Sequence, residues 1–210
     1  ISATPTYHYN LLSQPRCELI QNWCPAPIVI NAYIETYIEK DIRQLMSIKD
    51  RDRFLRFISL CAGNIGSLLN LSRIANDCSI TVPTAKSWLS VLQASYICFT
   101  LKPHSSNFRK RMVKTPKLYF HDIGLACRLL GIQEEVQIRT HPLRGNLFEN
   151  MVVADLLKTQ INQGVDASMF FWRDRAGHEI DLLLENGIHL QAMEIKSGET
   201  FITSWLDNLN

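Results

Sequence analysis

The sequence predicts an α+β protein in which a helical unit is followed by a unit built around a β-sheet. Residues 32–92 carry apolar side chains at steps of three and four, which is typical of amphipathic helices. Beyond residue 95 the apolar residues gather in short runs of strand formers, and Asn186-Gly187 is a strong signal for a two-residue hairpin turn. With 210 residues, 46% of them apolar, the chain is long enough to form two small cores.

These patterns divide the chain into three segments. Residues 1–31 hold four prolines and little periodicity, which favours a linker or the tail of a preceding domain. Residues 32–131 form the predicted helical unit, and residues 132–210 form the predicted sheet unit. Because the chain begins with Ile1 and stops inside a predicted helix, we expect both ends to be cut and the sheet unit to be incomplete at its C-terminus.

The helical unit contains the order of elements found in a winged helix. Helices are predicted over residues 32–48 and 52–62, and a shorter one over 71–77 with Asn70 or Ser72 as its N-cap. After a tight turn, Thr81 caps a further helix whose apolar stripe is Ala85, Trp88, Leu89 and Leu92. Two short helices joined in this way are a helix-turn-helix, and the strands predicted at 96–101 and 118–120 would form the wing.

The loop between those two strands is the most basic part of the chain. Six basic residues and no acidic residue lie between positions 102 and 117, which suits contacts to DNA phosphates. The candidate DNA contacts come from this loop and from the second helix of the pair: Lys86, Arg109, Lys110, Arg111 and Lys114. That helix exposes no arginine for reading guanine, so a sequence-specific transcription factor is disfavoured. A solvated loop and a helix-turn-helix that contacts protein are the alternatives.

The sheet unit brings acidic residues together on one face. A helix predicted over residues 145–157 carries Glu149 on an apolar surface, where a carboxylate needs a cation, a metal or water. Strands are predicted at 170–173, 179–184 and 188–196. If the Asn-Gly turn pairs Glu185 with Ile188, Asp181 lies opposite Ala192 and diagonal to Glu194.

The two carboxylates and a lysine suggest a metal site. Asp181 and Glu194 could hold one Mg²⁺ or Mn²⁺ between them, because hard oxygen ligands select these ions over zinc. Lys196, one pleat beyond Glu194, could orient water or stabilise charge on a phosphate. A surface cluster making ordinary ion pairs would have the same spacing.

Composition excludes several other classes of protein. A net charge of +2 argues against a globally basic DNA-coating protein. The six cysteines form no Cys-x-x-Cys pair, so we expect buried thiols rather than a metal or redox site. No apolar run is long enough to span a bilayer and no signal peptide begins the chain, so we expect a cytoplasmic protein without a membrane contact.

Two known patterns are similar to these residues. Asp181, twelve residues, then Glu194-Ile195-Lys196, after a helix that bears Glu149, resembles the PD-(D/E)xK nuclease superfamily, although Ile180 replaces the proline of the simple motif. From about residue 30 to the end the chain resembles the DUF4143 domain, which is typically the C-terminal part of predicted AAA-type ATPases. The stretches that carry this second resemblance are residues 33–41, 114–126, 145–149, 172–173, 179–181 and 194–198.

The resemblances imply a restriction-endonuclease-like sheet domain. Asp181 and Glu194 would bind Mg²⁺ or Mn²⁺, and Lys196 and Glu149 would act in catalysis. No Gly-x-x-x-x-Gly-Lys-Ser/Thr phosphate-binding loop occurs, so ATP would bind only in a missing N-terminal half. We therefore expect a DNA-associated C-terminal module of an ATPase, with DNA and the ATPase domain as partners, oligomerisation through the ATPase, and candidate nuclease activity. The alternative is a non-catalytic regulatory or protein-interaction module.

Overall fold

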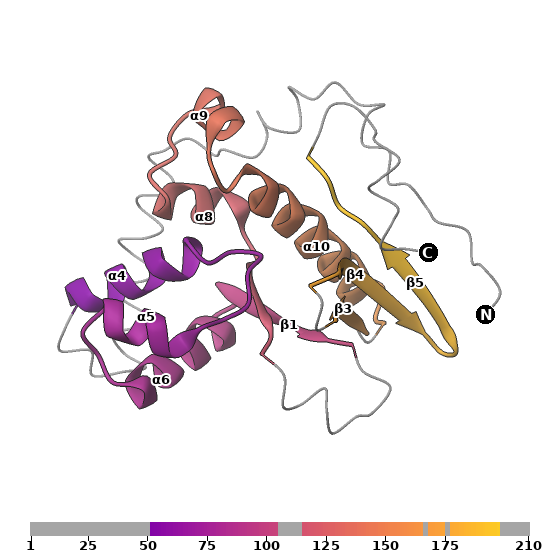
Figure 1. Cartoon of the computed structure of the whole chain (residues 1–210), viewed down its shortest axis with the longest axis horizontal. Helices are drawn as coiled ribbons and strands as arrows, with labels where there is room; N and C mark the ends of the chain where they lie inside the picture. The colour runs from indigo at the N-terminus through magenta and orange to yellow at the C-terminus, as the bar shows by residue number, and fades with distance from the viewer. Residues whose placement is uncertain (1–50, 105–114, 166–167, 175–176, 198–210) are drawn as a thin grey trace.

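The computed structural model describes residues 51–104, 115–165, 168–174 and 177–197, which form a mixed α/β fold (Figure 1). Six helices and one five-stranded sheet occur within these ranges, and the strand order is β2-β1-β3-β4-β5. The mixture of helices and sheet agrees with the predicted α+β class. The expected linker at 1–31 and the helix at 32–48 lie outside the described residues. No helix in the described part of the chain combines the length and the apolar character needed to cross a membrane.

The three helices described between residues 51 and 94 form where the periodicity predicts them. They are α4 (Arg51–Ala62), α5 (Leu71–Asp77) and α6 (Val82–Ala94). The side chains of Asn70 and Thr81 accept hydrogen bonds from the backbone N–H groups of Arg73 and Thr84, so these two residues are the N-caps and Ser72 is not. Trp88 on α6 meets the rings of Phe54 and Phe57 edge-on, with centroids 5.2 and 5.5 Å apart. These rings are part of the core of the helical unit. The helical unit lies at one end of the sheet (Figure 1).

The hairpin that follows α6 belongs to the same sheet as the second unit. Strand β1 (Cys98–Pro103) pairs antiparallel with β2 (Lys117–Phe120) and parallel with β3 (Met169–Arg173). The parallel contact is short, with Lys102 and Pro103 opposite Phe170 and Phe171. Strands β4 (Glu179–Asn186) and β5 (His189–Met193) complete the sheet through antiparallel pairing. One continuous sheet therefore connects the helical unit to the strands that carry the predicted metal ligands.

Helix α10 (Arg144–Asn162) covers this sheet. It follows α8 (Ile123–Leu129) and the short α9 (Glu135–Thr140). Figure 1 shows α10 running from beside α8 to beside β3 and β4. Buried residues of α10 and of the strands form a second core, which contains Leu101, Tyr119, Met151, Val152, Val153, Met169, Phe171, Leu182, Met193 and Ile195.

Asparagines attach α10 to the first unit. The buried Asn150 accepts a hydrogen bond from Phe120 N at 2.6 Å and donates one to Phe120 O at 3.0 Å, so its amide pairs with β2 as a neighbouring strand would. One turn earlier, Asn146 Nδ2 donates to Ile65 O at 3.0 Å. Because buried backbone groups require partners, these bonds fix where α10 sits against β2.

The register of the β4–β5 hairpin differs from the prediction by two residues. Asn186 pairs with His189, so the turn residues are Gly187 and Ile188 rather than Asn186 and Gly187. Gly187 has φ +62° and Ile188 is not among the residues with positive φ, which fits a type II′ turn with glycine at its first central position. Leu182 consequently pairs with Met193, and Asp181 lies toward Glu194 instead of Ala192. Because the shift is an even number of residues, the faces along β5 are unchanged.

A bulge in β4 changes the direction of Asp181. Phe170 pairs with Leu183 and Trp172 with Ile180, so two steps along β3 correspond to three along β4. Asp181 lies in this interval, and both it and Leu182 are buried. Successive side chains of a strand normally point to opposite faces of the sheet, and the bulge interrupts this alternation at Asp181 and Leu182 because it turns a side chain away from its regular direction.

The cysteines of the described residues behave as buried thiols. Cys61, Cys78, Cys98 and Cys127 are free and buried, as expected, while Cys17 and Cys24 lie outside the described residues. Burial raises the pKa of Cys98 to about 12, so its thiol is protonated at neutral pH.

Candidate functional site

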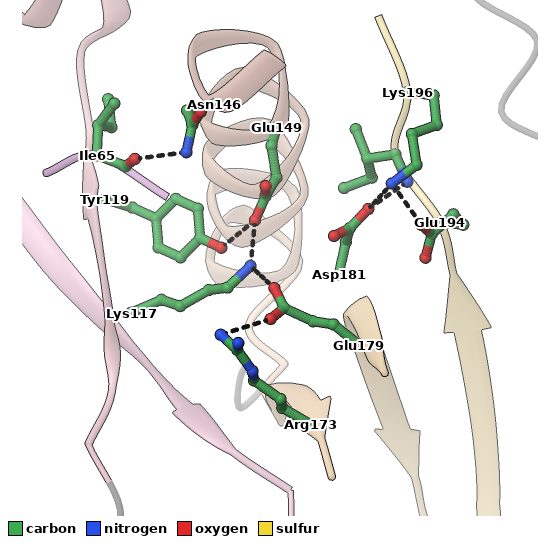
Figure 2. A network of polar contacts seen from close by, with 11 residues as sticks. Ile65, Lys117, Tyr119, Asn146, Glu149, Arg173, Glu179, Asp181, Glu194 and Lys196 are labelled. Carbon is green, nitrogen blue, oxygen red and sulfur yellow. Dashed lines mark hydrogen bonds and ion pairs between the residues drawn. The ribbon is translucent and has the colours of Figure 1, made fainter. Parts of the chain in front are cut away.

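Three of the predicted site residues converge at the end of the β4–β5 pair. They are Asp181 on β4 and Glu194 and Lys196 in the segment after β5, and we call them the Asp181 cluster. Lys196 Nζ lies 3.4 Å from Asp181 Oδ2 and also forms an ion pair with Glu194 Oε1 (Figure 2). The backbone N–H of Ile195 donates to Asp181 Oδ2 at 2.8 Å. The side chains of Asp181 and Glu194 are only 10% and 8% exposed, whereas that of Lys196 is 38% exposed.

One carboxylate oxygen in this cluster lacks a partner. Glu194 Oε2 is buried and accepts no hydrogen bond from any described residue. Burial raises the pKa of Glu194, although the hydrogen bond from Lys196 opposes this. For Lys196, burial acts to lower the pKa, but Glu194 and Asp181 outweigh burial and the pKa is raised. The lysine is therefore a stable cation, and a second cation or water would satisfy the remaining oxygen of Glu194.

A second polar network lies beside the first and connects four elements of the fold. It consists of Lys117 and Tyr119 on β2, Glu149 on α10, Arg173 on β3 and Glu179 on β4, and we call it the Lys117 cluster. Lys117 is only 3% exposed, and its Nζ donates to Glu149 Oε1 at 2.9 Å and forms an ion pair with Glu179 Oε1 (Figure 2). Tyr119 donates its O–H to the same Glu149 oxygen at 2.5 Å. Arg173 Nη1 lies 3.3 Å from Glu179 Oε2.

Burial and neighbouring charges determine the protonation of the Lys117 cluster. Burial raises the pKa of Glu149, Lys117 lowers it, and the negative charge of Asp181 raises it again, with a net increase. The interaction with Asp181 shows that the two clusters are electrostatically connected. Burial also acts to lower the pKa of Lys117, but Glu149 and Glu179 outweigh it and the pKa is raised. Lys117 is thus a charged side chain in the interior, compensated by two carboxylates.

The structure changes the role of the predicted residue Glu149 and removes Lys117 from the basic surface. Glu149 lies close to Asp181, as expected, but its carboxylate is bound by Lys117 and Tyr119. Lys117, which the sequence placed in the basic loop, is buried, because β2 begins at this residue and turns its side chain toward α10. It is therefore not a surface phosphate contact.

The predicted DNA contacts are described only in part. Lys86 is exposed on α6, as a phosphate contact requires. The other four, Arg109, Lys110, Arg111 and Lys114, lie outside the described residues.

Sequence reasoning missed Lys117, Tyr119, Arg173 and Glu179 as site residues. A signal for the first two was present, since Lys117 and Tyr119 are two apart in a strand and so share a face. A lysine at the start of an otherwise apolar strand requires an acidic partner if that face is covered. Nothing in the sequence showed that α10 would place Glu149 over this face.

The residues present fit a divalent cation held by two carboxylates. Within the described ranges, no group of three or more His, Cys, Asp and Glu side chains is arranged to hold a metal. Asp181 and Glu194 nevertheless offer hard oxygen ligands, and the unpartnered Oε2 of Glu194 is available. Lys196 now contacts both carboxylates, so it would have to withdraw from at least one of them when a cation binds.

Fold and site together define a mixed α/β protein whose two units share one sheet and meet at a buried network of carboxylates and lysines. The chain belongs to the family described as "Domain of unknown function (DUF8612)", whose family model matches residues 20–136. Residues 144–210 match "Domain of unknown function (DUF4143)". The predicted DUF4143 resemblance is confirmed for this C-terminal part, whereas the stretches at 33–41 and 114–126 fall within the DUF8612 match.

Two mycobacterial proteins are similar to most of the chain. They are the uncharacterized protein Rv2008c of Mycobacterium tuberculosis (strain ATCC 25618 / H37Rv) and the uncharacterized protein Mb2031c of Mycobacterium bovis (strain ATCC BAA-935 / AF2122/97). Each is 28% identical over 170 residues, which cover 81% of this chain. The matched region spans 38% of the length of these relatives.

Proposed function

We propose that this chain is a DNA-associated module with a divalent-metal-dependent nuclease site at Asp181, Glu194 and Lys196. The observation that carries the proposal is the contact of Lys196 with both carboxylates of this cluster, beside a buried oxygen of Glu194 that has no partner among the described residues. Two carboxylates and a lysine, one carboxylate on a strand and the other two groups just after its neighbour, are the group that the resemblance to PD-(D/E)xK nucleases implies. The proposal treats the sheet unit as restriction-endonuclease-like and the helices with their hairpin as a winged-helix-type unit.

Each residue of the Asp181 cluster has a distinct part in the proposed chemistry. Asp181 and Glu194 would hold Mg²⁺ or Mn²⁺, which when bound supplies positive charge for polarising a phosphodiester and acidifying water. The N–H of Ile195 holds Asp181 through Oδ2, so the carboxylate would be positioned in advance to help hold the ion. Lys196 would donate a hydrogen bond to a phosphate oxygen and stabilise the charge that develops there. Its raised pKa keeps it positively charged in this role.

The helical unit would supply DNA affinity. Lys86 on the exposed side of α6, together with the predicted contacts of the basic loop, would neutralise phosphates and release counterions. Affinity of this kind falls steeply with salt and depends little on base sequence.

A specific observation favours the alternative, a non-catalytic regulatory or protein-contact module. The carboxylate of Glu149 is already bound by Lys117 and Tyr119, and Lys196 pairs with both carboxylates of its cluster. The charges are therefore largely compensated within the protein. In this second proposal the network is structural, and the module contacts the ATPase half that would occupy other parts of the longer protein and bind ATP there. Any oligomerisation would pass through that half.

Cleavage of supercoiled plasmid and of single-stranded DNA with Mg²⁺ or Mn²⁺ tests the first proposal. We expect the wild-type chain to cut, and Asp181→Asn and Lys196→Ala each to abolish cutting without unfolding the protein. Asp155→Asn changes an exposed carboxylate on α10 and is the matched control that should retain activity. Absence of cleavage together with absence of Mn²⁺ binding would reject the nuclease and favour the regulatory module.

A further inference from the structure

A line of aromatic rings runs from the protein surface to the Lys117 cluster. Tyr96 is 76% exposed, and its ring packs against His121 with centroids 5.8 Å apart. His121 in turn lies 4.7 Å from Phe99, and Phe99 stacks on Tyr119 at 5.5 Å with an interplanar angle of 20°. The ring of Tyr96 therefore contacts His121 on one side, while most of its surface remains open to solvent.

The position of Tyr96 in the backbone is unusual for a tyrosine. Tyr96 directly follows the C-cap of α6, its N–H donates to Gln93 O, and the N–H of Ile97 donates to Leu92 O. This is a Schellman motif, whose central residue is usually glycine because it adopts positive φ. Tyr96 has φ +54° there, a conformation that is unfavourable for a bulky side chain. Helix termination alone would favour glycine or asparagine, so the ring itself requires another explanation.

The charge around this ring suits an anion. Lys158 on α10 is exposed. Burial lowers the pKa of His121, and the positive charge of Lys158 lowers it further, so that charge acts on this group of rings. The carboxylate of the next residue, Asp122, accepts a hydrogen bond from Leu125 N at 2.7 Å as the N-cap of α8, so the partial positive charge of that helix end offsets part of its negative charge. An exposed aromatic ring together with a positive charge that acts on its surroundings is a combination with which proteins bind a base and its phosphate.

We propose that Tyr96, supported by His121 and accompanied by Lys158, is a stacking site for an unpaired base of a single-stranded nucleic acid. The proposal rests on the nucleic-acid association proposed above and specifies the substrate class. It does not depend on cleavage at Asp181. DNA and RNA share the bases and phosphates that this site would bind, so strands of both kinds must be compared.

The experiment is fluorescence anisotropy of the whole chain with labelled oligo(dT) and oligo(rU) of about 12 nucleotides, a length within the site size of such surfaces. EDTA is present so that no strand is cut. We expect Tyr96→Gly to weaken binding roughly 5- to 150-fold, the range for loss of one stacked base, and Tyr96→Phe to retain it. Lys158→Ala should weaken binding and lower its salt dependence by about one phosphate contact. The tighter of the two strands identifies the natural ligand as DNA or RNA.

Two controls test whether the Tyr96 variant remains folded and whether the effect on binding is specific to Tyr96. Tyr96→Gly should melt at the same temperature as the wild type or higher, because glycine favours positive φ. Ile188→Ala removes a side chain that is 94% exposed at the β4–β5 turn and should leave binding unchanged. Equal affinity of Tyr96→Gly and the wild type, or an equal loss in Ile188→Ala, would overturn the stacking site. Failure of the wild type to bind either strand would also overturn it and assign the ring to a protein partner. Cleavage with Mg²⁺ is measured separately, so a protein that binds strands but does not cut them rejects only the nuclease.

Discussion

Lys117→Met should show how strongly the buried ion pairs hold the two units together. Methionine keeps the length and apolar stem of the side chain but removes the charge that faces Glu149 and Glu179. Within the described part of the chain, Glu179 retains Arg173, whereas Glu149 retains only the hydrogen bond from Tyr119. One buried carboxylate is thus left without a cation, and breaking a buried pair in this way costs about 3–5 kcal/mol. For a protein of this size that loss lowers the melting temperature by roughly 6–20 °C.

The pH dependence of the stability of Lys117→Met tests whether the uncompensated charge of Glu149 causes the loss. In Lys117→Met the pKa of Glu149, already raised by burial, should rise further because Lys117 no longer lowers it. A group whose pKa is higher in the folded state than in the unfolded state contributes stability at low pH and loses it as pH rises through the folded pKa. The variant should therefore approach wild-type stability in acid and fall below it toward neutral pH.

Urea unfolding followed by circular dichroism, repeated across this pH range, measures both effects. Adding Glu149→Gln to Lys117→Met should restore part of the lost stability, because the uncompensated charge is then removed. A Lys117→Met variant that melts within about 2 °C of the wild type would refute the argument that this network stabilises the fold. A double variant that loses as much stability as the two single variants together would refute the same argument.

Two further predictions concern single residues. Burial raises the pKa of Glu194 above its ordinary value of 4.5, so the wild type should lose stability as pH rises through the raised pKa. Glu194→Gln lacks this titration, and its free energy of unfolding should therefore rise relative to that of the wild type as pH increases from below 4.5. Parallel pH profiles of the two proteins in urea unfolding would contradict this prediction. Asn150→Ala should destabilise the protein by about 2–5 kcal/mol, since it leaves both backbone groups of Phe120 buried and unpaired, and it should accelerate hydrogen exchange at the Phe120 amide. Unchanged exchange there would show that α10 does not secure β2 through this side chain.

Local physical chemistry explains which features were predictable. The caps at Asn70 and Thr81 and the buried stripe around Trp88 depend on interactions within a few residues, so pattern and spacing were sufficient to predict them. The meeting of Asp181, Glu194 and Lys196 was also predictable in outline. The register error was two residues, and a shift by an even number leaves each side chain on its face.

Only the tertiary structure decided the details of the site. The bulge beside Asp181 and the short parallel pairing of β1 with β3 arise between segments distant in sequence, and no local pattern indicates them. The ionic network likewise depends on where α10 lies, because Lys117 is buried only where Glu149 and Glu179 compensate its charge. The exposed ring of Tyr96 follows from a left-handed backbone at the end of α6, a position that sequence pattern would assign to glycine. The sequence by itself thus determined most of the described helices and strands and the acidic and basic residues available to the site. Which of those charges are paired, buried or open was decided by packing, because the free energy of a charge depends on its surroundings.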